Sequence, residues 1–227
     1  MKLNSFGCSF IFGSDLADDG SNIDYSDYSQ LTWPALLAKK IGYEYDCYAR
    51  AGSGNLRIME RVLSQIATND RGLYVIGWTW IDRFDYVSSN LDLANPFETA
   101  HWQTLMPVDT SDVANIYYKK LHSQLRDKLT TLMCIKLTID TLKQKQCPFI
   151  MTYMDDLIFE KTWHTTPAIV AMQEYIRPYM NEFNGQSFLE WSKSKGFKMS
   201  KTLHPLEAAH QAAADLVHQN LDKWTNS

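Results

Sequence analysis

The chain has 227 residues, which at roughly 100–200 residues per domain is one large domain or two very small ones. Hydrophobic types make up 45% and aromatic types 13%, so a buried core can form and the composition excludes a disordered chain. The net charge is −4 and no Lys/Arg cluster offers a basic face, which argues against a nucleic-acid partner. No apolar run approaches the ~18 residues of a membrane-spanning helix, and the first residues lack the apolar core of a secretory signal. We therefore expect a soluble, cytoplasmic protein that acts on small or neutral molecules without a membrane partner.

Strand and helix patterns alternate along the chain, and no repeat, low-complexity tract or Pro/Gly/Ser-rich linker interrupts them. We therefore expect one domain over residues 1–227, of the α/β class with a largely parallel sheet. The expected strands are residues 2–6, 44–48, 72–78, 147–153 and, as a last candidate, 197–199. The expected helices are residues 28–41, 55–67, 112–145, 188–195 and 205–221.

Four cysteines stand far apart, without a C-x-x-C pair or a histidine at zinc-ligand spacing: Cys8, Cys47, Cys134 and Cys147. In a chain without a signal sequence they are expected to be reduced and mostly buried thiols. Cys8 is set apart from the others, because it lies in a motif at the end of the first strand and could be reactive.

A long stretch without regular periodicity runs from about residue 79 to residue 111, and it is rich in aromatic side chains. Structureless segments of this length are uncommon inside compact domains and often serve as lids or binding loops. The aromatic residues can equally close a small satellite core, and the sequence leaves both interpretations open. The residues concerned are Trp80, Phe84, Tyr86, Phe97 and Trp102.

Three tight segments follow the first three strands, at residues 7–10, 51–55 and 77–80, and His204 stands just before the last helix. In an open parallel sheet, binding sites form beyond the carboxyl ends of the strands. A serine at one strand end and a late histidine are the pair that a serine hydrolase needs, because the hydroxyl requires an imidazole to take its proton. Taken alone, Ser9 could also be a helix cap.

In these segments the chain resembles the SGNH (GDSL-type) hydrolase family. Residues 7–10 (Gly-Cys-Ser-Phe) resemble the family's first block, Gly-Asp-Ser-Leu, and residues 51–57 resemble the second. Residues 77–80 stand where the third block, Gly-x-Asn-Asp, is expected, and the His-Pro pair at 204–205 resembles the fifth, Asp-x-x-His-Pro. The blocks occur in the family's order over nearly the whole chain. The chain also resembles uncharacterised family members encoded by tailed phages, for which a virion or host-cell location would follow.

The resemblance implies a role for four residues and a fold. Ser9 corresponds to the nucleophile, with Cys8 in place of the usual aspartate, and His204 corresponds to the catalytic base. The N–H groups of Ser9 and Gly52 would form the oxyanion hole, with the Thr79 hydroxyl in place of the family's asparagine. The implied fold is a flavodoxin-like α/β/α sandwich of three layers with about five parallel strands. Neither a metal nor a cofactor is implied.

The acid of the usual Asp-x-x-His motif is missing, because its position is occupied by Lys201. Asp155 and Asp156 are candidate acids, since they follow the fourth strand and so lie on the catalytic edge of the sheet. Glu207 is close to His204 in sequence but is expected to point outward. A Ser–His dyad, in which His204 donates to a backbone carbonyl, is the alternative that we favour at this point.

The expected function is hydrolysis of an ester, such as an O-acetyl or short acyl group on a carbohydrate. Two other classes of function remain open. One is a catalytically inactive protein that binds a glycan or a protein partner through residues 80–102. The other is a phosphate- or nucleotide-binding module that uses residues 7–13, although Gly52-Ser53-Gly54 lacks the G-x-G-x-x-G spacing of dinucleotide sites. The sequence does not fix the oligomeric state.

Overall fold

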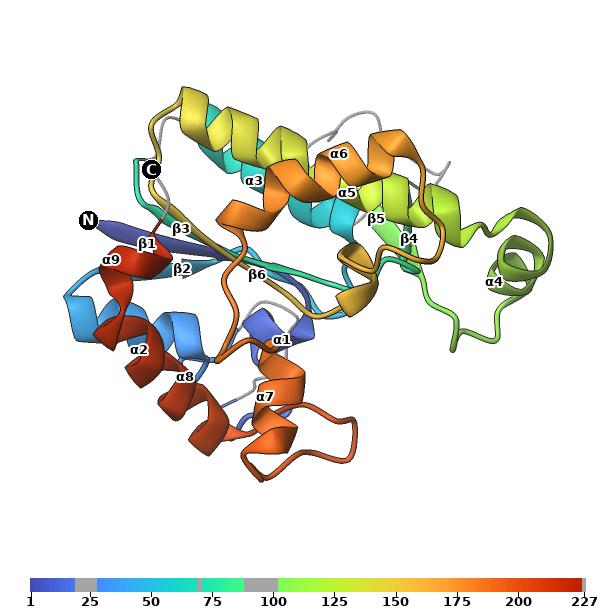
Figure 1. Cartoon of the computed structure of the whole chain (residues 1–227). Coiled ribbons are helices and arrows are strands. Elements are labelled where there is room, and N and C mark those ends of the chain that lie inside the picture. Colours follow the sequence, from blue (N-terminus) through green and yellow to red (C-terminus); the bar gives the residue numbers. More distant parts are fainter. Residues whose placement is uncertain (19–27, 69–70, 88–101, 226–227) are drawn as a thin grey trace, which may run out of the picture.

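Four parallel strands form the central sheet, in the order β2-β1-β3-β6 (Figure 1). They are β1 (Lys2–Phe6), β2 (Glu44–Cys47), β3 (Leu73–Trp78) and β6 (Phe149–Tyr153). The structure, a computed structural model, describes residues 1–18, 28–68, 71–87 and 102–225. The strand order reverses beside β1, because β2 pairs with one of its edges and β3 with the other. The crevice beyond the carboxyl ends of β1 and β3 is therefore where a site is expected in such a sheet.

Helices cover both faces of the sheet, so the molecule has three layers (Figure 1). The lower layer in this view holds α1 (Ser9–Phe12), α2 (Trp33–Ile41), α7 (Phe188–Ser194), α8 (Glu207–Gln219) and α9 (Leu221–Trp224). The upper layer holds α3 (Asn55–Ala67), α5 (Gln124–Gln144) and α6 (Pro167–Ile176). This arrangement confirms the expected α/β/α sandwich with a parallel sheet.

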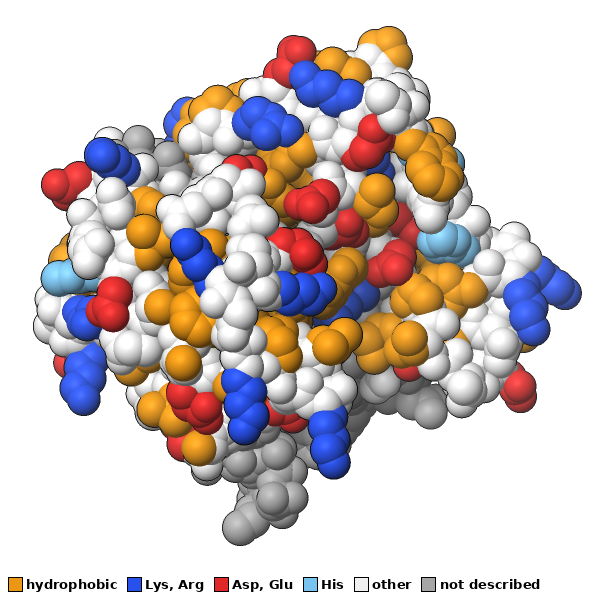
Figure 2. Space-filling view, turned by 60° about the horizontal axis from the view of Figure 1, so that its bottom comes forward, with side chains coloured by type: hydrophobic (Ala, Val, Ile, Leu, Met, Phe, Trp, Pro, Cys, Tyr) orange, Lys and Arg blue, Asp and Glu red, His pale blue; other side chains and the backbone are white. Residues whose placement is uncertain are grey.

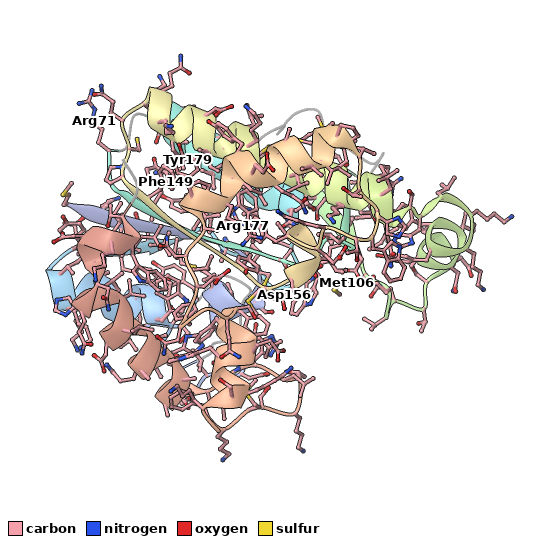
Figure 3. The ribbon with its side chains drawn as sticks, in the orientation of Figure 1. Arg71, Met106, Phe149, Asp156, Arg177 and Tyr179 are labelled. Atoms are coloured by element: carbon pink, nitrogen blue, oxygen red, sulfur yellow. The ribbon has the colours of Figure 1, made fainter. Side chains whose placement is uncertain are left out.

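Alternating side chains of the strands fill two separate hydrophobic cores. In β1, Leu3 lies in the core beneath α2 and α8, whereas Phe6 lies in the core against α3 and α5. Every residue of β3 is buried, as expected for a strand covered by helices on both faces. Phe149 of β6 points into the upper layer, where its ring centroid lies 6.0 Å from that of Tyr179 (Figure 3). Both faces of the sheet are thus packed against helices, so the carboxyl ends of its strands have fixed positions.

The expected fifth strand at residues 197–199 does not form. Met199 makes only an isolated bridge with Pro205, because the intervening residues turn back on themselves. Ser200 N donates to the carbonyl of His204, and Leu206 N donates to that of Lys198. The segment is therefore a tight turn that presents His204, and over the residues that the structure describes the central sheet has four strands instead of about five.

The long helix expected over residues 112–145 is divided into three pieces. They are α4 (Asp112–Ile116), the π-helical turn η2 (Tyr117–Leu121) and α5. The break falls at His122 and Ser123, where the backbone is extended and the Ser123 side chain accepts a hydrogen bond from Arg126 N. Helix α6 was not expected from the sequence; its start is marked by the cap Thr166 and the following Pro167.

The aromatic stretch after β3 contains regular structure in its described part. β4 (Phe84–Val87) and β5 (Trp102–Leu105) pair in antiparallel register and form a separate two-stranded sheet. Leu105 packs with Ala114 and Tyr117 in a small third core, to which Phe84 and Tyr86 add their rings. The described part of the stretch thus supports the satellite-core interpretation, and the lid or binding-loop interpretation stays a prediction. Phe97 lies outside the described residues.

All four cysteines are free and buried, as the sequence analysis expected. Within the described part of the chain, no helix combines the length and the apolar character that crossing a bilayer demands. Acidic and basic side chains are interspersed on the face shown in Figure 2, with hydrophobic side chains between them. This mixture fits the small net charge of the chain.

Candidate active site

Ser9 is the first residue of α1, a single helical turn that packs against the ends of β1 and β3. The close approach depends on two glycines. A Cβ atom on Gly7 would lie 2.6 Å from Ile11 Cγ1, and a Cβ atom on Gly77 would lie 2.8 Å from the same atom. The turn ends at Gly13, whose φ of 93° is left-handed and where a Cβ would lie 2.4 Å from that of Ser29. The sequence thus fixes Ser9 at the carboxyl edge of the sheet.

His204 lies directly against Ser9, although the two residues are separated by 195 positions in the chain. The distance between His204 Nε2 and Ser9 Oγ is 2.8 Å, which is a normal hydrogen bond. Ser9 is 8% exposed and the His204 side chain 15% exposed, so both are largely shielded from solvent. The ring of Phe10 packs on the imidazole with a centroid distance of 4.9 Å. The structure therefore brings together the two residues that the sequence analysis paired.

The other ring nitrogen of His204 faces Asp15, a residue that the sequence analysis did not single out as an acid. His204 Nδ1 lies 2.8 Å from Asp15 Oδ2 and also 2.8 Å from Thr202 Oγ1. The expected dyad, with Nδ1 on a backbone carbonyl, is therefore not what the structure has. A carboxylate reaches the imidazole from the segment just after α1.

The expected acids are placed elsewhere. Asp155 is buried, where its Oδ2 accepts from Ile81 N at 2.9 Å and its Oδ1 from Leu157 N at 3.0 Å. It thus caps η3 (Asp156–Ile158), and burial raises the pKa of its carboxyl. Asp156 begins that turn, beyond the carboxyl end of β6 (Figure 3). Both were wrong as partners of His204, because their backbone positions tie them to the turn after β6.

The segment after β2 lies beside the end of β1, since Arg50 N donates to the carbonyl of Gly7 at 3.1 Å. Gly52 has a φ of 77°, and its N–H makes no hydrogen bond within the part of the chain that the structure describes. The N–H of Gly54, by contrast, donates to Asp85 Oδ1 at 2.9 Å. Of the two glycines, Gly52 is therefore the one whose amide can serve a ligand.

Thr79 is fully buried at the end of β3. Its N–H donates to Asn55 Oδ1 at 2.9 Å, and its carbonyl accepts from Asn55 Nδ2 at 3.1 Å. Its Oγ1 is buried without a hydrogen-bond partner among the described residues. The hydroxyl can therefore donate a hydrogen bond to a ligand. Because Thr79 is fully buried, a substrate oxygen reaches this hydroxyl only if the side chains that cover it move.

The ring of Trp80 packs on Phe10, the residue that follows Ser9 in α1. The two rings meet edge to face at a centroid distance of 5.7 Å, and the Arg83 guanidinium lies over that of Trp80 at 4.9 Å. Arg83 Nη1 also donates to the carbonyl of Ser53 at 3.0 Å. The start of the aromatic stretch is therefore joined to both the Ser9 turn and the Gly52 turn.

Three contributing residues were missed by sequence reasoning: Asp15, Asn55 and Asp85. The Asp85 carboxylate accepts from the N–H groups of both Gly54 and Arg57, so it caps α3 from another element. Asn55 joins the second and third motif segments through its amide. Each of these side chains makes its hydrogen bonds to a partner far away in the sequence. The sequence marks them only as polar residues in or near the motif segments.

Comparisons with known proteins give no match to a family model and none to a curated protein sequence. Solved structures, however, share the fold over almost the full length. The psychrotrophic esterase EstA from Pseudoalteromonas sp. has a TM-score of 0.54 at 10% identity, over 98% of this chain and 97% of that chain. TesA gives 0.53 at 13% identity, over 97% and 98%. The acetyl xylan esterase AlAXEase gives 0.50 at 11% identity, over 97% and 100%. The chain therefore has the SGNH-type α/β fold expected from its motifs.

Proposed function

We propose that the protein is a serine esterase, with Ser9 as nucleophile and His204 as general base. The single observation that supports this most directly is the 2.8 Å hydrogen bond between Ser9 Oγ and His204 Nε2, made across 195 residues of chain. A serine that only capped α1 would need no imidazole at this position. The fold shared with EstA and AlAXEase, both named as esterases, supports the same reaction class.

The chemistry follows from the geometry. His204 Nε2 accepts the proton of Ser9 Oγ as the oxygen attacks the ester carbonyl, and a tetrahedral intermediate forms. The N–H groups of Ser9 and Gly52, with the Thr79 hydroxyl as a third donor, stabilise its negatively charged oxygen. The imidazolium then gives the proton to the departing alcohol, which leaves the acyl group on Ser9. Water attacks this acyl group while His204 Nε2 takes its proton, and the imidazolium returns the proton to Ser9 Oγ as the carboxylic acid leaves.

The proposed substrates are esters with a small acyl group, such as O-acetyl groups on a carbohydrate. The named activity of AlAXEase, an acetyl xylan esterase, supports this class. The partly exposed ring of Trp80 supports it as well, because it packs on Phe10, whose buried ring contacts His204, and a flat apolar ring suits the face of a sugar ring. Neither a metal nor a cofactor takes part in the proposed steps.

A fluorophosphonate probe tests the proposal, because only an activated serine reacts with it covalently. The structure of EstA is described as inhibited by monoethylphosphonate, which supports this choice of reagent. We expect the intact protein to be labelled once, at Ser9, and to hydrolyse p-nitrophenyl acetate. Ser9→Ala should lose labelling and about 10⁴–10⁶-fold in kcat. Ser64→Ala, which removes an exposed serine of α3, is the matched control.

Absence of labelling and turnover in the intact protein would contradict the esterase proposal. Binding of acetylated or plain xylo-oligosaccharides without turnover would then favour the inactive glycan-binding alternative. Turnover that persists in Ser9→Ala would place the activity at another site.

A further inference from the structure

The carboxylate against His204 comes from the same short segment as the nucleophile. Asp15 stands six positions after Ser9, beyond the left-handed Gly13 that ends α1. Its own φ is 70°, a conformation that aspartate tolerates better than most residues do. The two reversals in backbone direction turn the chain back toward the Ser9 end of α1. As a result, one stretch of seven residues delivers both a hydroxyl and a carboxylate to the imidazole.

Three groups converge on one oxygen of this carboxylate. Asp15 Oδ2 lies 2.8 Å from His204 Nδ1 and accepts from Ser200 Oγ at 2.7 Å. Thr202 Oγ1 also donates to it. All three partners belong to the tight turn that takes the place of the expected fifth strand. The two hydroxyls therefore hold the carboxylate in the position where the imidazole meets it.

Ser200 links the carboxylate to the backbone of the histidine. Its Oγ accepts from Thr202 N and from His204 N, both at 3.1 Å, while it donates to Asp15. A hydroxyl with one proton and two lone pairs is fully used in this arrangement. The position of Asp15 and the orientation of the turn that carries His204 are thereby coupled.

The far side of the Asp15 segment is anchored as well. Glu207 Oε1 accepts from Ala17 N at 2.9 Å, and Asp18 Oδ2 accepts from Gln30 N at 2.7 Å. The sequence analysis expects Glu207, close to His204 in sequence, to point outward. The structure uses it to hold the backbone that carries the carboxylate.

We infer that Asp15 supplies the carboxylate of a Ser–His–Asp triad, and that Ser200 and Thr202 are positioning residues that hold it on His204 Nδ1. The inference rests on the proposed esterase function and assigns the acid of the same site. It explains how a chain with Lys201 at the usual acid position can keep a complete triad. The hydrogen bond from Thr202 lowers the pKa of the Asp15 carboxyl, which keeps it ionised at neutral pH.

The first arm of the test removes the charge of Asp15. Asp15→Asn should lower kcat for p-nitrophenyl acetate by about 10³–10⁴-fold with little change in KM, because an amide cannot stabilise the imidazolium. Asparagine tolerates the left-handed backbone, so the fold should be kept. Asp156→Asn, at the acid position expected from the sequence, is the matched control and should stay within about tenfold of the intact enzyme.

The second arm separates positioning from packing. Thr202→Val removes the hydroxyl at nearly constant volume and should lower kcat about tenfold with KM unchanged, whereas Thr202→Ser should recover most of the loss. Lys201→Ala, between the two hydroxyl residues, should have no effect. Equal losses in Thr202→Val and Thr202→Ser would contradict a positioning role for this hydroxyl.

A third arm reads the hydrogen bond without relying on turnover. The proton NMR spectrum of the intact enzyme should show a far-downfield imidazole N–H signal from the His204–Asp15 pair. The signal should disappear in Asp15→Asn and His204→Ala and persist in Asp156→Asn. Absence of the signal from the intact enzyme, or an Asp15→Asn variant with full kcat, would overturn the assignment of the acid. Since fluorophosphonate labelling and its loss in Ser9→Ala test the esterase itself, the two proposals can fail separately.

Discussion

Single residues beside Ser9 and His204, the proposed catalytic pair, adopt backbone conformations that most side chains avoid. Leu203 has a φ of 65° and is 59% exposed, so little burial compensates for its strain. It directly precedes His204 and closes the turn in which Leu203 N donates to the carbonyl of Ser200. Strain of this kind is often kept where the backbone must present a functional side chain.

Relief of this strain should stabilise the protein without loss of activity. A left-handed conformation costs a side chain such as leucine about 1–2 kcal/mol, and asparagine pays less. Leu203→Asn should therefore raise the free energy of unfolding by about 1 kcal/mol, measured by urea denaturation. The kcat for p-nitrophenyl acetate should not change. A variant that is less stable than the parent would show that the leucine side chain has a packing role.

The hydroxyl of Thr79 gives a second test at the scale of one residue. Because its Oγ1 has no hydrogen-bond partner among the described residues, Thr79→Val should cost little stability. If the hydroxyl donates to the oxyanion, the same change should lower kcat by about 10²-fold with KM nearly constant. Steady-state kinetics on p-nitrophenyl acetate decide the matter, and an unaltered kcat would assign Thr79 to packing alone.

At the scale of elements, the site is assembled where four segments meet at one edge of the sheet. α1 carries Ser9, the proposed nucleophile, and the turn after β2 carries Gly52. The end of β3 carries Thr79, and the turn before α8 carries His204. The start of the aromatic stretch adds Trp80, which bridges two of these segments through Phe10 and Arg83. Trp80 is thus linked to the turn that carries Ser9 through Phe10, and to the turn that carries Gly52 through Arg83.

Loss of the Trp80 ring should therefore affect large substrates more than small ones. Trp80→Ala should raise KM for acetylated xylo-oligosaccharides about tenfold and leave KM for p-nitrophenyl acetate nearly unchanged, because only the larger substrate reaches this ring. Initial rates over a range of both substrates give the two values. Parallel changes for both substrates would indicate a general disturbance of the fold, for which Trp102→Ala on β5 serves as comparison.

Helices and strands that are marked by their own residues and by those directly flanking them were predicted well from the sequence. β1 and α3 have the bounds that were expected, because apolar periodicity and flanking glycines mark both. The division of the helix over residues 112–145 was missed, since its apolar pattern continues through the break at Ser123. The pairing of Ser9 with His204 followed from motif order. Asp15 was missed because its contact spans 189 residues and nothing local marks a carboxylate as the partner of an imidazole.

At the scale of the whole molecule, a neutral histidine in the lower core couples stability to pH. His210 is 2% exposed, its Nδ1 accepts from Trp33 N at 3.0 Å, and its ring lies against Phe188. Burial lowers the pKa of this imidazole to about 3. A histidine in an unfolded chain has a pKa of about 6.5. Between this value and the pKa of folded His210, the imidazole is protonated in the unfolded state and neutral in the folded state.

Because the pKa of His210 is lower in the folded state than in the unfolded state, this residue makes the protein less stable as the pH falls. The contribution of His210 is complete above about pH 6.5 and is lost as the pH falls, at up to about 1.4 kcal/mol per pH unit. His210→Asn keeps an acceptor for Trp33 N but cannot be protonated. We expect the variant to be less stable than the parent protein at pH 7. The difference between their free energies of unfolding should narrow by about 1–2 kcal/mol at pH 5.5, measured by urea denaturation. If the free energies of unfolding of the two proteins fell in parallel as the pH is lowered, His210 would not be the source of the acid sensitivity.

The distance along the chain between Ser9 and His204 has a consequence for the time at which the protein becomes competent. The hydroxyl of Ser9 and the carboxylate of Asp15 are synthesised six positions apart, but the imidazole of His204 follows 195 positions after Ser9. A nascent chain can therefore form most of its sheet while it still lacks a base. Labelling by a fluorophosphonate would begin only once α8 has docked on α2 and closed the turn in front of it. Under the proposed function, labelling of Ser9 would therefore report that the segment around Ser9 and the turn that carries His204 have come together.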